Sequence, residues 1–128
     1  KDEVPVGAVI VSNDKVIARA HNLTEMLNDV TAHAEMQAIT SAANYLGGKY
    51  LKDCTLYVTL EPCQMCAGAM YWAQSTRLVF GASAKHRGYR KLKTTLHPKT
   101  KVSYGTLSNE CKLLIDAFFI KKRKLKKL

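Results

Sequence analysis

Four residues in two short segments have the types and the spacing to bind and use a metal ion. His33 and Glu35 lie two positions apart, and Cys63 and Cys66 form a Cys-x-x-Cys pair. One imidazole and two thiolates are ligands that zinc prefers, and three protein ligands leave the fourth tetrahedral position open for water. Zinc lowers the pKa of a bound water from about 15.7 to about 7. We therefore predict one Zn²⁺ per subunit, held by His33, Cys63 and Cys66, at a site built for hydrolysis.

Glu35 supplies the second part of this chemistry. A carboxylate beside the open zinc position can take a proton from water and later deliver it. Residues two positions apart on a helix point about 200° apart, so His33 and Glu35 reach one ion only near the helix end. Taken singly, each residue has a structural explanation: a packed histidine, a structural zinc half-site or redox pair, an acid that complements a helix dipole. The combination is more specific and favours Glu35 as the catalytic acid and base.

Both segments are predicted to begin helices. Thr31 can cap a helix over 32–46, which ends at Gly47, and Pro62 precedes a helix over 63–74. A helix N-terminus favours negative charge and stabilises thiolates, so two such ends that face each other can hold one ion. The other expected elements are strands over 6–11, 16–20, 55–60, 77–80 and 102–104 and a last helix over 107–128.

The order of these elements indicates the fold class. Strands that alternate with helices favour a three-layer α/β/α domain with a mixed sheet. A length of 128 residues fits a single domain over 1–128. Cys54, at the start of a strand, and Cys111, on an apolar helix face, are expected to be core thiols.

The positive charge lies entirely in the last third of the chain. The net charge is +10, but residues 1–84 carry a net charge of −2, and residues 85–128 contain 14 basic and 2 acidic residues. Such a concentration of charge favours a polyanionic partner such as nucleic acid. A solvated tail that only aids solubility is the alternative. Aromatic residues interleaved with the basic ones, among them Tyr89 and Tyr104, favour nucleic acid.

The sequence shows no sign of a membrane or secreted protein. No apolar run approaches the roughly 20 residues that a membrane span needs. The first residues do not resemble a signal peptide. We therefore expect a cytoplasmic protein with no membrane partner.

On these residues, the chain resembles the cytidine deaminase-like superfamily, and within it the bacterial tRNA-specific adenosine deaminases. His33-x-Glu35 with Pro62-Cys63-x-x-Cys66 matches the signature of the zinc-dependent nucleobase deaminases. A Thr-Leu-Glu-Pro-Cys segment and a double Phe before a basic end point to the tRNA enzymes. The resemblance covers nearly the whole chain, in the stretches 4–11, 21–23, 31–35, 56–63, 65–69, 79–82, 110–111 and 118–119.

The resemblance implies roles that the residues alone do not. Asn22 and the backbone N–H of Ala34 would bind the substrate base, while Phe119 and Arg123 would contact RNA beside it. The implied fold is a central five-stranded sheet with helices on both faces, in a homodimer whose sites are bordered by the neighbouring subunit. The implied reaction is hydrolytic deamination of adenosine to inosine at the wobble position of a tRNA anticodon.

The chain also departs from this family. A helix normally precedes the strand that begins near Val4, so we expect such a segment to be missing from the sequence given. Val30 stands where many relatives have proline, and the segment 85–90 replaces a glycine-rich loop, so RNA contacts there are not carried over.

Two alternatives remain open. The first is a small-molecule deaminase acting on guanine, cytosine or cytidine, which the Tyr71-Trp72-Ala73 stretch favours and the basic last third disfavours. The second is a non-catalytic zinc fold that binds RNA, which the presence of Glu35 disfavours. From the residues alone, Asn22 also fits an ordinary turn after a hairpin.

Overall fold

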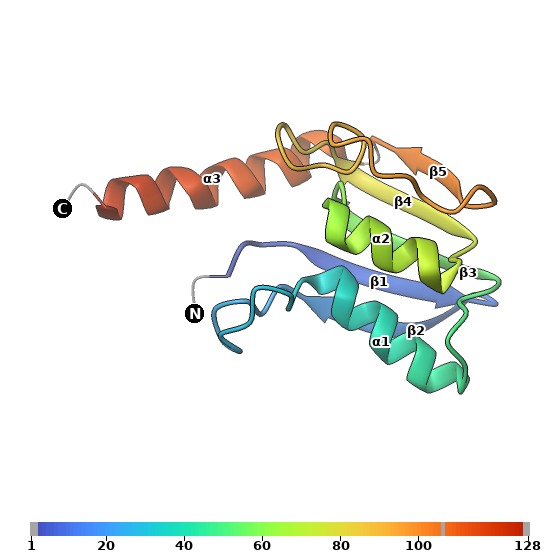
Figure 1. Cartoon of the computed structure of the whole chain (residues 1–128). Helices are drawn as coiled ribbons and strands as arrows, with labels where there is room; N and C mark the ends of the chain where they lie inside the picture. The colour runs from blue at the N-terminus through green and yellow to red at the C-terminus, as the bar shows by residue number, and fades with distance from the viewer. Residues whose placement is uncertain (1–2, 106, 127–128) are drawn as a thin grey trace.

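Five strands form one mixed sheet in the order β2-β1-β3-β4-β5 (Figure 1). β1 (Gly7–Ser12) pairs antiparallel with both β2 (Lys15–His21) and β3 (Cys54–Leu60). β4 (Arg77–Ala82) runs parallel to β3, and β5 (Lys101–Tyr104) runs parallel to β4. This computed structural model describes residues 3–105 and 107–126, without the side chains at 108, 111, 114, 115 and 122–126.

The hairpin of β1 and β2 follows from its turn residues. Asn13 and Asp14 have φ values of 49° and 62°. Two consecutive left-handed residues make the turn type that matches strand twist, and Asn and Asp adopt it at low cost. The predicted hairpin is therefore confirmed.

Two helices lie side by side on one face of the sheet (Figure 1). They are α1 (Ala34–Leu46) and α2 (Gln64–Ala73). Their small and apolar residues, such as Ala38 and Met70, join the inward side chains of the strands, among them Ile10, Leu56 and Phe80, in one fully buried core. Cys54 belongs to this core, as predicted, whereas the side chain of Cys111 lies outside the described residues.

The third helix, α3 (Ser108–Lys126), contacts β3 and β4 and extends beyond the ends of the strands (Figure 1). Just before it, Leu107 borders a groove together with Tyr57 and Val79, on the side of the sheet opposite α1 and α2. The predicted α/β/α class with a five-stranded mixed sheet is confirmed. None of the described helices is long and apolar enough to cross a membrane.

Both site helices begin later than predicted. His33 and Cys63 are the N-caps of α1 and α2 and have extended backbones, with ψ values of 152° and 175°. The prediction that Thr31 caps α1 is wrong, because the amide and the hydroxyl of Thr31 both donate to the Asp29 carboxylate, at 2.8 and 2.7 Å. The Asp29 side chain thus fixes a local turn over 29–31, and the helix begins only after His33.

Candidate metal centre and active site

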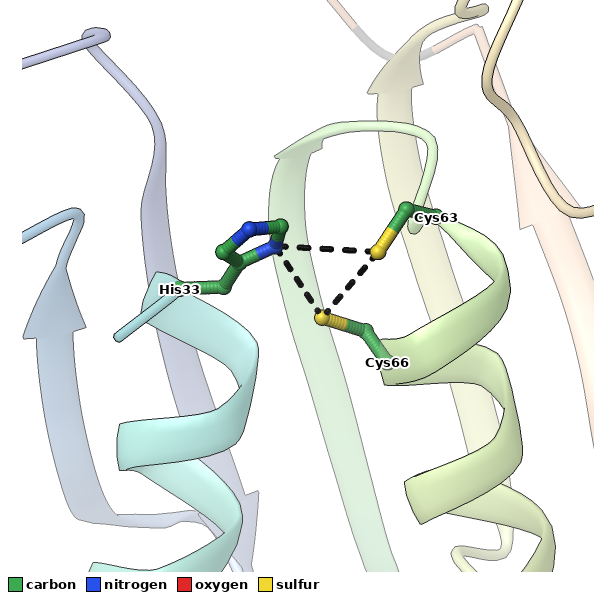
Figure 2. A group of neighbouring side chains, drawn as sticks. All are labelled: His33, Cys63 and Cys66. Atoms are coloured by element: carbon green, nitrogen blue, oxygen red, sulfur yellow. Dashed lines mark hydrogen bonds between the residues drawn. The ribbon is translucent and has the colours of Figure 1, made fainter. Parts of the chain in front are cut away.

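Three potential metal ligands meet where the N-termini of α1 and α2 come together. Figure 2 shows the His33 ring pointing from the start of α1 toward two sulfurs at the start of α2. His33 Nδ1 lies 3.6 Å from Cys63 Sγ and 3.5 Å from Cys66 Sγ, and the two sulfurs lie 3.7 Å apart. None of the described cysteines forms a disulfide.

These distances fit a tetrahedral zinc ion. Zn–N bonds of about 2.0–2.1 Å and Zn–S bonds of about 2.3 Å at tetrahedral angles separate N from S by about 3.6 Å, and S from S by about 3.8 Å. The ligand atoms of these three residues all lie within 4.8 Å of one another, close enough to hold one metal ion. Among the described residues, His33, Cys63 and Cys66 form the group of His, Cys, Asp or Glu side chains that meets this condition. The cofactor prediction of one Zn²⁺ therefore agrees with the donor set.

The start of α2 prepares the sulfurs as ligands. A hydrogen bond from the Cys66 thiol, aided by the backbone amides of Cys66 and Met65, lowers the pKa of Cys63 to about 5. The same shared proton raises the pKa of Cys66. The thiolate is the form of cysteine that binds metals, so one sulfur is already in that form at neutral pH.

Glu35 is buried beside these ligands, with only 4% of its surface exposed. Burial raises the pKa of its carboxyl group. A buried carboxylate accepts a proton more readily than an exposed one, which suits a general base. Because His33 is an extended N-cap and not a helical residue, the two side chains do not diverge as helix geometry would require, and both line one cavity.

That cavity has a volume of about 260 Å³. Asn22, the residue after β2, also lines the cavity and is 7% exposed, and its backbone N–H donates to the Val6 carbonyl at 3.1 Å. Ala34 is fully buried between His33 and Glu35. The lining consists of Val4, Val6, Asn22, Thr24, His33, Glu35, Leu60, Glu61, Cys63, Ala84 and Arg87. A larger groove of about 370 Å³ on the opposite face of the sheet contains none of the predicted site residues.

Sequence reasoning assigned no site role to seven residues of this lining, among them Glu61, Ala84 and Arg87. The only sequence feature that could have indicated Glu61 is its position directly before Pro62-Cys63. No local sequence pattern indicates that Ala84 and Arg87 line the cavity. Glu61 is 4% exposed and accepts hydrogen bonds from Arg90 and from the amide of Ala84. Burial alone would raise the pKa of Glu61, but these donors lower it, so the carboxylate stays charged.

The residues expected to contact RNA are not part of the cavity. Phe119 lies on α3, is 43% exposed and packs edge-to-face on Phe118, with ring centroids 5.3 Å apart. Arg123 lies on the same helix, but its side chain is outside the described residues. The roles of both remain predictions.

A family model, a curated relative and a solved structure that resemble this chain all belong to deaminases. Residues 1–82 match the family model of the cytidine and deoxycytidylate deaminase zinc-binding region. The chain is 44% identical over 133 residues to a tRNA-specific adenosine deaminase of Bacillus subtilis, covering 99% of this chain and 83% of that protein. A solved structure from a study of A-to-I editing by tRNA:A34 deaminases at the wobble position has a TM-score of 0.79 and 41% identity, over 88% of this chain and 86% of the other.

A second solved structure resembles part of the chain. It is a guanine deaminase from Bacillus subtilis, with a TM-score of 0.60 and 46% identity, and the match covers 61% of this chain and 50% of that one. The chain thus resembles solved structures that are named for different substrates.

Proposed function

Because this chain belongs to the cytidine and deoxycytidylate deaminase family, with its zinc-binding region, we propose that it is a zinc-dependent hydrolase that converts adenosine to inosine at the wobble position of a tRNA anticodon. The observation that carries the chemistry is the spacing of His33 Nδ1 and the sulfurs of Cys63 and Cys66, with Glu35 in the same cavity. We assign the whole chain 1–128 to one such domain with a basic C-terminal helix.

In this proposal His33, Cys63 and Cys66 hold one zinc ion. When bound, zinc supplies Lewis acidity that lowers the pKa of a water for attack on the purine carbon that bears the amine. Glu35 takes the proton released by that water onto its carboxylate. It gives this proton to the neighbouring ring nitrogen. It then takes the second proton of the former water from the hydroxyl group now on the carbon and gives it to the amine, which leaves as ammonia. Burial raises the pKa of the Glu35 carboxyl group, so its carboxylate is a stronger base toward water than an exposed one would be.

Asn22 and the backbone N–H of Ala34 are the proposed contacts to the base. Asn22 lines the cavity and is nearly buried, so its side-chain amide offers a donor and an acceptor at a place shielded from water. The cavity volume is near the lower end of the usual range for small-molecule sites, which suits a single base. A base in an anticodon loop is single-stranded and can be turned outward at low cost.

The basic last third of the chain supports RNA as the substrate. Lys and Arg residues of 85–128 that are not paired with acidic side chains would bind phosphates, and Phe119 and Arg123 would contact RNA beside the target base. We also propose a cytoplasmic homodimer in which the neighbouring subunit borders each site.

Free guanine is the second candidate substrate, because a guanine deaminase structure matches 61% of the chain. A free base offers no phosphate, so the basic segment would then have no role in substrate binding.

One assay panel separates the two candidates. The zinc-loaded protein is incubated with an anticodon stem-loop that contains adenosine, with free guanine and with cytidine, and ammonia and product are measured. We expect inosine from the stem-loop and no release from the other two. Ammonia from guanine but not from the stem-loop would overturn the proposed substrate.

A further inference from the structure

Glu61 joins the zinc-ligand loop to a segment that lies far away in the sequence. Its carboxylate Oε1 accepts from the Ala84 amide and from Arg90 Nη2, both at 3.1 Å. Its Oε2 accepts from the amide and from Nε of Arg90, at 3.0 and 3.2 Å. Both oxygens of this buried carboxylate are thus satisfied by the wall segment, which we define as residues 83–90.

The guanidinium of Arg90 has further contacts that fix its position. Its Cζ lies 4.4 Å from the ring centroid of Tyr104 and 5.0 Å from that of Phe80. These two rings are stacked at 5.3 Å, and Arg90 Nη2 also donates to Ser83 Oγ at 2.7 Å. The carboxylate of Glu61, the two aromatic rings and the hydroxyl of Ser83 together hold the planar guanidinium in one orientation. A lysine ammonium at this position could not make the same set of contacts.

The wall segment also contacts the backbone of the ligand loop. The Tyr89 amide donates to the Pro62 carbonyl at 2.9 Å, and Cys63 and Gly88 form an antiparallel bridge. A Cβ atom added to Gly88 would lie 2.6 and 2.5 Å from the two carboxylate oxygens of Glu61. The close approach of the two segments therefore needs a glycine at this position.

Two residues of the wall segment, Ala84 and Arg87, line the cavity that also contains His33, Glu35 and Cys63. The segment carries no helix and, apart from the single bridge, no strand pairing. It is also basic, with Lys85, Arg87 and Arg90 close together. A charged, irregular segment has many conformations, so its place at the cavity depends on the contacts that hold it.

We propose that Arg90, through its ion pair with Glu61, is a positioning residue that holds the wall segment against the cavity and so sets how tightly substrate binds. The identity of that substrate rests on the proposed function, but the positioning role does not. Arg90 does not touch the reacting atoms. Its loss therefore raises KM and leaves kcat and zinc content nearly unchanged, because binding made equally in ground and transition states affects KM alone.

Three variants and one matched control test this role. Arg90→Ala removes the guanidinium, Arg90→Lys keeps the charge but not the planar group, and Gly88→Ala displaces the carboxylate without touching either charge. Arg77→Ala is the control, because it removes the same positive charge at a residue that does not line the cavity and whose side chain donates to Ser103 Oγ at 3.1 Å.

The readouts are KM and kcat on the anticodon stem-loop, zinc content, and amide hydrogen exchange of the wall segment. We expect Arg90→Ala to raise KM about tenfold or more with kcat within about threefold, and to speed exchange in 83–90 about tenfold but not in α2. Arg90→Lys should show about a third of the change in KM, and Arg77→Ala none. If Arg90→Ala does not fold, Gly88→Ala and Arg90→Lys give the same readouts.

Two results would overturn the proposal. One is an unchanged KM together with unchanged exchange in the variants. The other is a loss of zinc and kcat at constant KM. That result would show that Arg90 positions the zinc ligand Cys63 and not the wall segment. Failure of the proposed function is distinguishable, because the wild type would then not deaminate the stem-loop. The kinetic comparison would move to whichever substrate the wild type accepts, and the exchange measurement would stand without any substrate.

Discussion

His33 and Cys63 occupy equivalent positions, each as the N-cap of a helix, and Nδ1 of one lies 3.6 Å from Sγ of the other. The two helices start side by side, so their free amides and positive dipole ends point into the same space. This arrangement gathers ligands from segments 30 residues apart and favours the thiolate form of a sulfur. It also lets the next residues of α1 contribute Glu35 to the same cavity.

Cys63→Ser should lose zinc and stability together. A serine hydroxyl is a poor zinc ligand, and the binding energy of a metal held only by the folded state adds to folding stability. We expect bound zinc to fall to about a tenth or less, measured by atomic absorption, with a lower Tm. Cys54→Ala is the matched control, because Cys54 is buried in the core and is no part of the ligand group. It should lower Tm but keep full zinc content. Full zinc occupancy in Cys63→Ser would refute the ligand role.

Glu35→Gln should keep the fold and the zinc but lose turnover. Glutamine has nearly the same shape as glutamate but cannot carry the proton, and a positioned acid or base typically contributes about 10²- to 10⁴-fold in rate. The decisive quantity is kcat at saturating stem-loop RNA, with zinc content measured on the same sample. Glu25→Gln, an exposed acid near the cavity-lining Thr24, serves as the control and should leave kcat unchanged. Turnover within about threefold of wild type in Glu35→Gln would remove the proposed proton carrier.

The contribution of Glu61 to the free energy of unfolding should fall as the pH becomes acidic. Its donors hold the folded-state pKa below the ordinary value of 4.5. The unfolded state therefore binds a proton first, so the stabilisation is fully present above about pH 4.5 and is lost as pH falls through the lower folded-state pKa. Denaturant titrations of wild type and Glu61→Gln at several pH values measure it. The difference between the two should shrink below pH 4.5, and a difference that grows on acidification would contradict the assignment.

Binding of the stem-loop should weaken steeply with salt. For single strands the logarithm of the affinity falls with a slope of about 0.7 per neutralised phosphate, so about four contacts predict roughly a 50-fold loss between 50 and 200 mM salt. Fluorescence anisotropy of a labelled stem-loop gives Kd at each salt concentration. Replacing the exposed Lys91 and Lys99 by Gln should reduce the slope, while the same change at the exposed Lys15 and Lys52 should not. Equal slopes for both pairs would show that the basic last third does not bind the RNA.

The parts of the fold that sequence predicted are those with strong local signals. The alternating strands, the two site helices and the hairpin all depend on residues a few positions apart, such as Asn13 and Asp14 in the turn. The ligand group was predictable because its chemistry restricts the residue types. The exact helix starts were not, because the Asp29 carboxylate accepts from both the amide and the hydroxyl of Thr31 and fixes a turn where a cap was expected. The pairing of Glu61 with Arg90 was also not predictable, since a contact between residues 29 positions apart leaves no periodic pattern.

X-ray absorption at the zinc edge of the metal-loaded protein tests the central claim most directly, because it counts and identifies the atoms bound to the ion. One imidazole nitrogen, two sulfurs at about 2.3 Å and one further light atom that exchanges with added ligands is the expected result. A shell of four protein donors, or a sulfur count other than two, would contradict a hydrolytic centre with an open position.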